Sequence, residues 1–212
     1  MSFGDGGFVA LVPVKPPAIG KSRLGGVADR AALARAIAID TICAARDTAA
    51  VARVLVVTES DDSSGDAFGE EVRALGVEVC ADPGGGLNAA LRAGSAVARG
   101  RWPALRPVAL LADLPALTPD LLDTALASVA GGPAYCSDAE GTGTTLYTAA
   151  YDDFDPRFGA GSAAAHRDAG GVPIEGGLAG LRRDVDDAES LAAARVLGLG
   201  PATSALLESV PK

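Results

Sequence analysis

The chain has 212 residues, of which 49% are hydrophobic and 21% are charged, a balance that supports a folded core. This composition excludes a disordered polyampholyte and a disulfide-stabilised miniprotein. The 18 basic and 27 acidic residues give a net charge of −9, which argues against sequence-independent nucleic-acid binding, because such binding must neutralise many phosphates.

The terminus and the apolar runs bear on cellular location. The longest run without Asp, Glu, Lys or Arg is Thr124–Ser137, which is too short to span a bilayer and contains two glycines and a proline. The start of the chain, Met1–Asp5, has neither the basic region nor the apolar run of a signal peptide. We therefore expect a cytoplasmic protein without a membrane helix, folded as a single domain over residues 1–212.

Cysteine and histidine usage restricts the chemistry further. Cys43, Cys80 and Cys136 are far apart and have no CxxC spacing. We therefore expect these cysteines to act as small buried hydrophobic residues. His166 is the single histidine, so a histidine-based zinc site is almost excluded. A Ser-His-Asp triad would need the same histidine, and the sequence has no GxSxG motif.

Apolar runs and helical segments alternate over the first 130 residues. The runs that predict buried strands are Phe8–Val14, Arg53–Thr58, Val77–Cys80 and Pro107–Ala112. Apolar residues at helical spacing predict helices over Asp29–Thr48, Gly65–Leu75 and Leu87–Arg99, and another that begins at Pro119 with Thr118 as its N-cap. This alternation predicts an α/β fold with a mostly parallel, mixed sheet and helices on both faces.

The pattern changes after Gly132, where the predicted elements are shorter. We expect strands at Ala134–Ser137, Thr144–Thr148, Val172–Ile174 and Leu181–Val185. Ser162 is predicted to cap a short helix over Ala163–Asp168, and Asp186 and Glu189 are predicted to form the capping box of a helix over Ala188–Val196.

In an open parallel sheet, ligands bind beyond the carboxyl ends of the strands, so the loops there are the candidate sites. The loop after the first strand carries Lys15, Lys21 and Arg23 and predicts a polyphosphate site. The alternative is a solvated basic surface loop. Gly20-Lys21-Ser22 resembles the end of a P-loop, but Lys15 stands where that motif needs its first glycine, so the match fails.

The loop after the third strand contains three consecutive glycines, Gly84–Gly86, followed by Asn88. Such a loop lets the backbone approach a planar ligand, and the next helix presents free N–H groups. Gly84, Gly86 and Ala89 also match the G-x-G-x-x-A pattern of nicotinamide-dependent oxidoreductases, but they follow the third strand rather than the first. A plain tight turn is the other alternative.

Aspartates supply the candidate metal ligands. Asp113 follows the fourth strand and is placed to hold a hard cation, although an ordinary turn aspartate is an equal alternative. Asp184 and Asp186 alternate along an extended segment, so their side chains should point the same way. Asp186 has a structural explanation as the expected N-cap, whereas Asp184 has none.

Two further glycine-rich loops, Gly141–Thr145 and Phe158–Ser162, are candidate anion sites. The first offers hydroxyls and exposed amides, and the second ends at the predicted N-cap serine with free amides behind it. Together with the basic loop they suggest two phosphorylated ligands. The alternative for each is a flexible glycine loop without a ligand.

The order of these motifs resembles a known family, the guanylyltransferases of coenzyme F-420 biosynthesis, which act on phosphoenolpyruvate or 2-phospho-L-lactate. The resemblance covers about residues 8–200 and is carried by the following segments: Leu11–Lys15, Gly20–Leu24, Asp82–Asn88, Ala112–Leu117, Gly141–Thr145 and Phe158–Ser162. It implies a nucleotidyltransferase fold of the glycosyltransferase-A type. The implied reaction joins GTP and phosphoenolpyruvate to give enolpyruvyl-diphospho-5'-guanosine and pyrophosphate.

The resemblance also implies roles for particular residues. Thr144, Gly159 and Ser162 would hold phosphoenolpyruvate, and Asp113, Asp184 and Asp186 would hold Mg²⁺. We further expect Lys15, Lys21 and Arg23 to bind the triphosphate and to act with Asp113 in catalysis, and Gly85, Gly86 and Asn88 to contact the nucleotide. The acceptor phosphate is already ionised at neutral pH, so the reaction needs no general base.

The sequence leaves some alternatives open. No single residue distinguishes phosphoenolpyruvate from 2-phospho-L-lactate, and we favour the former because the Ala, Gly and Arg bias is typical of GC-rich actinobacterial genomes. A related cytidylyltransferase or molybdenum-cofactor nucleotidyltransferase remains possible, although the latter usually has a Gly-rich loop after the first strand, where this chain has Pro13–Pro17. A non-catalytic nucleotide sensor is the alternative outside the enzyme class.

Overall fold

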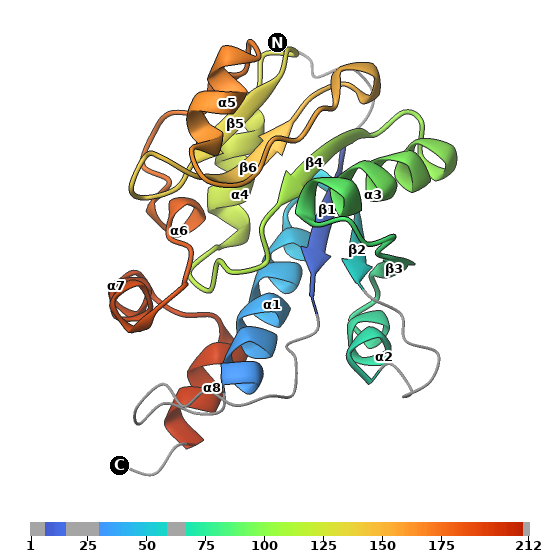
Figure 1. Ribbon diagram of the computed structural model, residues 1–212. Helices are drawn as coiled ribbons and strands as arrows, with labels where there is room; N and C mark the ends of the chain where they lie inside the picture. Colours follow the sequence, from blue (N-terminus) through green and yellow to red (C-terminus); the bar gives the residue numbers. More distant parts are fainter. Residues whose placement is uncertain (1–6, 16–29, 59–66, 210–212) are drawn as a thin grey trace.

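The computed structural model describes residues 7–15, 30–58 and 67–209, and within these ranges the strands form one seven-stranded sheet (Figure 1). The order across the sheet is β3-β2-β1-β4-β6-β5-β7. The strands are β1 (Phe8–Val14), β2 (Val51–Thr58), β3 (Glu78–Ala81), β4 (Arg106–Leu110), β5 (Ala134–Ser137), β6 (Thr144–Thr148) and β7 (Val172–Pro173).

Helices connect these strands and continue beyond the last of them. They are α1 (Arg30–Asp47), α2 (Ala67–Ala74), α3 (Leu87–Arg101), α4 (Pro119–Ala127), α5 (Ser162–Asp168), α6 (Ala179–Arg182), α7 (Ala188–Leu197) and α8 (Pro201–Ser209), with a 3-10 turn η1 at Tyr151–Asp153. No single helix in the described ranges has the length and apolar character of a membrane span; α7 and α8 meet that test only together, as a pair bent by 119°.

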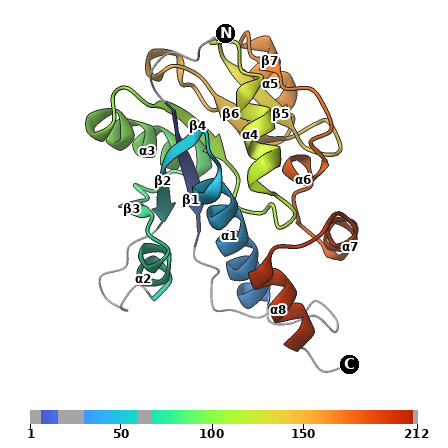
Figure 2. The same ribbon diagram turned by 180° about the vertical axis from the view of Figure 1, so that it is seen from behind.

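Both faces of the sheet are covered, as the hydrophobic pattern of β1 requires. Ala10 and Val12 pack into one core with residues of α1, α2 and α4, while Val9 and Leu11 pack into a second core with residues of α3 and α5. Accordingly α3 lies in front of the sheet in Figure 1, and α1 and α4 lie in front of it in the opposite view of Figure 2. The expected α/β architecture is confirmed.

Only β6 runs against the other described strands of the sheet, since it pairs antiparallel with both β4 and β5. Its first residue, Thr144, therefore pairs with Ser137 at the end of β5, and the Leu111 N–H just beyond β4 donates to the Thr145 carbonyl at 3.0 Å. The start of β6 thus lies at the same edge of the sheet as the carboxyl ends of β4 and β5.

Three predictions for the second half are corrected by the structure. Leu181–Val185 is no strand: its first two residues end α6 and the rest is extended chain. Ser162 is the first residue of α5, and the cap is Gly161, whose φ of 71° favours glycine. The cap of α7 is Asp187, which forms a capping box with Ser190, so Asp186 is free of that role.

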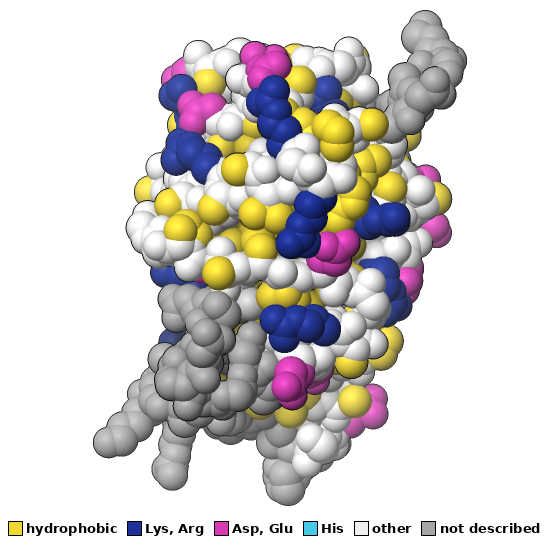
Figure 3. Space-filling view, turned by 90° about the vertical axis from the view of Figure 1, so that its right-hand side faces the viewer, with side chains coloured by type: hydrophobic (Ala, Val, Ile, Leu, Met, Phe, Trp, Pro, Cys, Tyr) yellow, Lys and Arg dark blue, Asp and Glu magenta, His cyan; other side chains and the backbone are white. Residues whose placement is uncertain are grey.

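Figure 3 looks onto the side of the molecule where α3 and β3 lie, and it shows basic, acidic and apolar side chains interspersed. Several arginines of α3 form ion pairs with carboxylates of other elements, among them Arg101 with Glu78 and Arg92 with Asp155 at 2.8 Å. The positive charge of this helix is therefore largely matched by local carboxylates.

Candidate active site

The candidate site lies at the carboxyl edge of the parallel strands. β1 ends at Val14, which pairs with Thr58 at the end of β2, and the exposed Lys15 follows directly. Asp113 lies three residues beyond the end of β4. Lys21 and Arg23, the other two cations of the predicted triphosphate site, lie outside the described residues.

The turn that carries Asp113 is held by a buried threonine of α1. Thr41 Oγ1 lies 3.3 Å from the carbonyl of Ala112 and accepts a hydrogen bond from the N–H of Leu114 at 3.2 Å. These contacts fix the backbone on both sides of Asp113. Thr41 could not be identified from the sequence, because a threonine inside an Ala-rich helix gives no local signal of a contact more than 70 residues away.

The segment Asp184–Asp186 lies against the same turn. The N–H of Val185 donates to the carbonyl of Asp113 at 3.0 Å, and the Val185 side chain packs with Leu33 and Ile37 of α1. Asp184 and Asp186 both line one cavity of about 550 Å³. The two carboxylates therefore share one cavity, although this segment is not part of the sheet.

Burial and mutual repulsion disfavour negative charge on two of these aspartates. Asp113 Oδ1 is buried and has no hydrogen-bond partner among the described residues. Burial, followed by the charges of Asp184 and Asp186, raises the pKa of Asp113 to about 7. Burial also raises the pKa of Asp184, with smaller contributions from neighbouring carboxylates. A cation bound between such groups would relieve both effects.

The cavity next to this turn is strongly acidic. Its lining residues are mostly carboxylates, with one arginine: Asp138, Glu140, Thr142, Arg183, Asp184, Asp186, Asp187, Glu189, Ser190 and Ala193. Arg183 is already paired with Glu140 at 2.8 Å. Within the described ranges, no three His, Cys, Asp or Glu side chains are close enough to form a ready-made metal cage. The cavity therefore has the charge to attract cations without a complete protein ligand set.

The β5–β6 turn is closed by its own aspartate. The Asp138 carboxylate accepts the N–H groups of Thr142 at 2.9 Å and Gly143 at 2.7 Å. In the neighbouring loop, the N–H of Ser162 donates to the carbonyl of Gly159 at 3.1 Å. The N–H of Ala163 donates to the carbonyl of Thr142, also at 3.1 Å. The expectation that these amides are free for an anion is therefore wrong, because the protein itself uses them.

The hydroxyls at these loops are better placed to bind a ligand. Thr144 and Ser162 are both buried, and Ser162 Oγ makes no hydrogen bond to any described residue. Thr144 Oγ1 lies 3.0 Å from Nδ1 of His166, which is one helical turn after Ser162 in α5. The structure thus brings Thr144 and the Gly159–Ser162 segment together around His166. From the sequence alone, His166 served only to argue against a histidine-based zinc site and a Ser-His-Asp triad.

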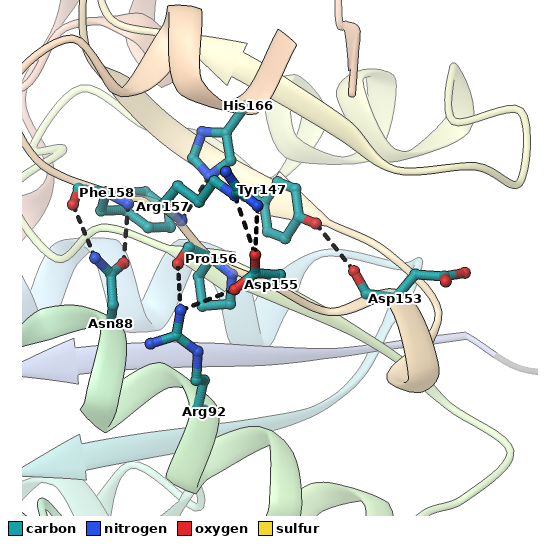
Figure 4. Close-up of polar contacts among 9 residues, drawn as sticks. All are labelled: Asn88, Arg92, Tyr147, Asp153, Asp155, Pro156, Arg157, Phe158 and His166. Atoms are coloured by element: carbon teal, nitrogen blue, oxygen red, sulfur yellow. Dashed lines mark hydrogen bonds and ion pairs between the residues drawn. The ribbon is translucent and has the colours of Figure 1, made fainter. Parts of the chain in front are cut away.

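The glycine loop before α3 is linked to the same region. Gly84, Gly85 and Gly86 have φ values of 78°, 85° and 92°, so the turn itself requires glycine. Asn88, in the first turn of α3, makes two hydrogen bonds of 2.9 Å to Phe158: its amide nitrogen donates to the carbonyl and its amide oxygen accepts the N–H (Figure 4). Both polar atoms of Asn88 are therefore already engaged with the loop that leads to Gly159.

Comparison with known proteins places this arrangement in a family. The chain is 47% identical over 208 residues to the phosphoenolpyruvate guanylyltransferase of Thermomonospora curvata, and the match covers 95% of this chain and 89% of the relative. The chain belongs to the phosphoenolpyruvate guanylyltransferase family. Another member, from Streptomyces coelicolor, is 47% identical over 92% of this chain and 93% of its own. The member from Rhodococcus opacus is 39% identical over 94% and 90%.

Solved structures agree at the level of the fold. A 4-diphosphocytidyl-2C-methyl-D-erythritol synthase superposes with a TM-score of 0.61 at 15% identity, covering 90% of this chain and 99% of the other. A cytidylyltransferase from Leptospira borgpetersenii gives a TM-score of 0.55 at 15% identity, covering 96% and 93%. No protein-family model matches the chain. This member of the phosphoenolpyruvate guanylyltransferase family therefore has a nucleotidyltransferase fold. Nucleotidyltransferases generally use a divalent metal ion.

Proposed function

We propose that this chain transfers the guanylyl group of GTP to phosphoenolpyruvate, giving enolpyruvyl-diphospho-5'-guanosine and pyrophosphate, as a step in coenzyme F-420 biosynthesis. The observation that carries this proposal is the 47% identity to a phosphoenolpyruvate guanylyltransferase over 95% of the chain. The geometry supports it, because one edge of the sheet carries both a carboxylate-rich cavity and a pair of buried hydroxyls.

The reaction is an in-line substitution at phosphorus. A phosphate oxygen of the acceptor forms a bond to the α-phosphorus of GTP, while the bond from that phosphorus to the bridging oxygen breaks and pyrophosphate leaves. The nucleophile is an ionised phosphate, so no protein group has to remove a proton. Catalysis is then a matter of holding two anions in line and offsetting their repulsion.

The candidate site residues divide between the two substrates. Lys15, at the end of β1, would contact the triphosphate, and we assign Lys21 and Arg23 to the same group from the sequence alone. Gly85 and Gly86 would pass close to the nucleotide, with Asn88 acting by holding the loop at Phe158. Thr144, Gly159 and Ser162 would hold the acceptor, each hydroxyl donating to one of its oxygens.

The aspartates fit Mg²⁺. The ion prefers oxygen ligands and is commonly held by one or two carboxylates together with substrate phosphates and water, so a complete protein cage is not needed. Asp113, with an unpartnered buried oxygen, and Asp184, coupled to it by charge, would be its ligands, with Asp186 beside them. When bound, Mg²⁺ supplies positive charge that stabilises the developing charge on the phosphates.

The test is an incubation of the purified protein with GTP and Mg²⁺ and, in parallel, phosphoenolpyruvate, 2-phospho-L-lactate or 3-phosphoglycerate. We expect pyrophosphate release and a product with the mass of enolpyruvyl-diphospho-5'-guanosine with the first acid. Faster turnover of 2-phospho-L-lactate would identify that acid as the acceptor, and a preference for CTP would identify cytosine as the base that the enzyme recognises. Nucleotide binding without pyrophosphate from any acid would favour a non-catalytic nucleotide-binding protein.

A further inference from the structure

His166 connects the parts of the proposed acceptor site. It is buried in α5, and each ring nitrogen has a partner on another segment. Nδ1 lies 3.0 Å from the hydroxyl oxygen of Thr144 in β6. Nε2 accepts the backbone N–H of Arg157 at 2.9 Å, two residues before Gly159 (Figure 4). One imidazole ring thus contacts both segments of the proposed acceptor site.

The hydrogen bond from Arg157 determines which ring nitrogen carries the proton. A backbone N–H can only donate, so Nε2 must present its lone pair, and the proton of the neutral ring is on Nδ1. Burial, followed by the charge of Arg157, lowers the pKa of His166 to about 4, so the ring is neutral at pH 7.

This tautomer determines the direction of the Thr144 hydroxyl. Because Nδ1 carries a proton, Thr144 Oγ1 cannot donate to it and can only accept. The hydroxyl proton of Thr144 therefore points away from His166, and it has no acceptor among the described residues. It is available to a negatively charged ligand, and a hydrogen bond to an ionised acceptor is among the stronger ones.

Aromatic contacts hold the ring in this orientation. Tyr147 is stacked on it with centroids 4.5 Å apart and an interplanar angle of 17°, and Tyr135 lies near it at 5.9 Å. Phe158 packs edge-on at 5.4 Å. Asn88 fixes Phe158 in turn through its two backbone hydrogen bonds. A half-turn of the ring would place carbon atoms where Nδ1 and Nε2 now lie, so both hydrogen bonds would be lost although the stacking would remain.

We propose that His166 is a positioning residue for the acceptor: it keeps the Thr144 hydroxyl as a hydrogen-bond donor to an oxygen of the phosphorylated acid and holds the Arg157–Gly159 backbone beside it. The proposal rests on the proposed function for the identity of that acid. The arrangement favours a ligand that presents acceptor oxygens only, such as an ionised carboxylate or phosphate. A ligand hydroxyl at this point would have to turn its own proton elsewhere.

The tautomer can be measured without any activity. His166 is the only histidine of the sequence, so a proton–nitrogen correlation spectrum of tag-free, nitrogen-labelled protein shows a single imidazole. We expect a protonated Nδ1 and an unprotonated Nε2 at pH 7. An Nε2-protonated ring, or one that averages between tautomers, would overturn the proposal whatever the enzyme does.

The effect on the acceptor is tested with two substitutions that both remove the bond to Arg157. His166→Phe keeps an aromatic ring but cannot donate to Thr144, whereas His166→Asn places an amide nitrogen near the position of Nδ1. We expect His166→Phe to raise the KM for phosphoenolpyruvate about tenfold or more, as the loss of a hydrogen bond to a charged group predicts, with the KM for GTP nearly unchanged. His166→Asn should recover part of that loss. Equal increases for both substrates would indicate a merely structural role.

A double-substitution cycle with Thr144→Val shows whether His166 acts through the threonine. If it does, His166→Phe adds little to the KM change that Thr144→Val already causes; independent effects that simply add would contradict the proposal. Should His166→Phe fail to fold, His166→Asn and the spectrum still decide the outcome. Absence of turnover by the unaltered enzyme would overturn the proposed function and with it the acceptor assignment, whereas the spectrum tests the tautomer separately.

Discussion

At the scale of single residues, Asp113 combines two properties that are seldom found together. Its carboxyl group has a buried oxygen without a hydrogen-bond partner in the part of the chain that the structure describes, and its neighbours Asp184 and Asp186 carry charge of the same sign. A buried polar atom without a partner costs stability, so its presence is better explained by a ligand than by folding. The sequence could indicate Asp113 because it follows a strand, but the unpartnered oxygen is visible only in the structure.

We expect Asp113→Asn to lower the turnover rate by about 100-fold or more, because it removes a negatively charged metal ligand. The fold should stay intact, and the melting temperature without Mg²⁺ should not fall, since the substitution removes a buried charge. Activity assays and thermal denaturation check both parts. Asp120→Asn, at an exposed position of α4, is the matched control. Near-normal turnover by Asp113→Asn would reject the metal assignment.

Ser162 tests the acceptor side at the same scale. Ser162 is a buried residue at the start of α5 and its hydroxyl bonds to no described residue, so Ser162→Ala should leave stability nearly unchanged. We expect it to weaken phosphoenolpyruvate binding by about tenfold while GTP binding changes little. Isothermal titration with each substrate measures this, with Ser209→Ala in α8 as the control. Equal losses for the two substrates would mean that the acceptor lies elsewhere.

At the scale of elements, side-chain hydrogen bonds add to backbone pairing in holding the site loops in place. Asn88 joins α3 to Phe158, Thr41 of α1 holds the Asp113 turn, and Asp138 closes the β5–β6 turn. Sequence patterns predicted the central strands and most helices, because periodicity is a local signal. They could not predict these contacts, which join residues far apart in the chain, and they placed the cap of α7 one residue early, at Asp186 instead of Asp187.

Asn88→Ala tests one of these connections. It leaves the N–H and carbonyl of Phe158 without their partners in a partly buried setting, so we expect a loss of about 1–3 kcal/mol in the free energy of unfolding. Because the loop leads to Gly159, the KM for the acceptor should rise as well. Urea denaturation and steady-state kinetics provide the two measurements. Direct readout of the base by Asn88 would instead change the preference between GTP and other nucleotides without loss of stability.

At the scale of the whole molecule, the C-terminal helix supports the candidate site. The buried carboxylate of Asp40, next to Thr41 in α1, accepts the N–H groups of Ala202 and Thr203 at the start of α8 at 2.9 and 2.8 Å. The N–H of Gly200 donates to the carbonyl of Pro115 at 2.8 Å, two residues after Asp113. No sequence pattern predicted α8 or this support, since Asp40 lies more than 160 residues from its partners.

We expect Asp40→Ala to lower the free energy of unfolding by about 3 kcal/mol, because two hydrogen bonds to a buried carboxylate are lost. Turnover should fall by less than for Asp113→Asn, since only the support of the turn is weakened. Chemical denaturation with parallel activity assays measures both quantities. Asp47→Ala, an exposed aspartate of the same helix, should be nearly neutral. A neutral Asp40→Ala would show that α8 is not held by this contact.

The reversed direction of β6 has a consequence for how the proposed acceptor site is encoded. Because β6 begins at the ligand edge, one uninterrupted stretch of chain, residues 134–168, contains Thr144, Gly159, Ser162 and His166. The parallel half of the sheet comes from an earlier stretch and joins it mainly along β4 and β6. Under the proposed assignment, changes confined to the later stretch would alter the acceptor site and leave the proposed nucleotide residues as they are.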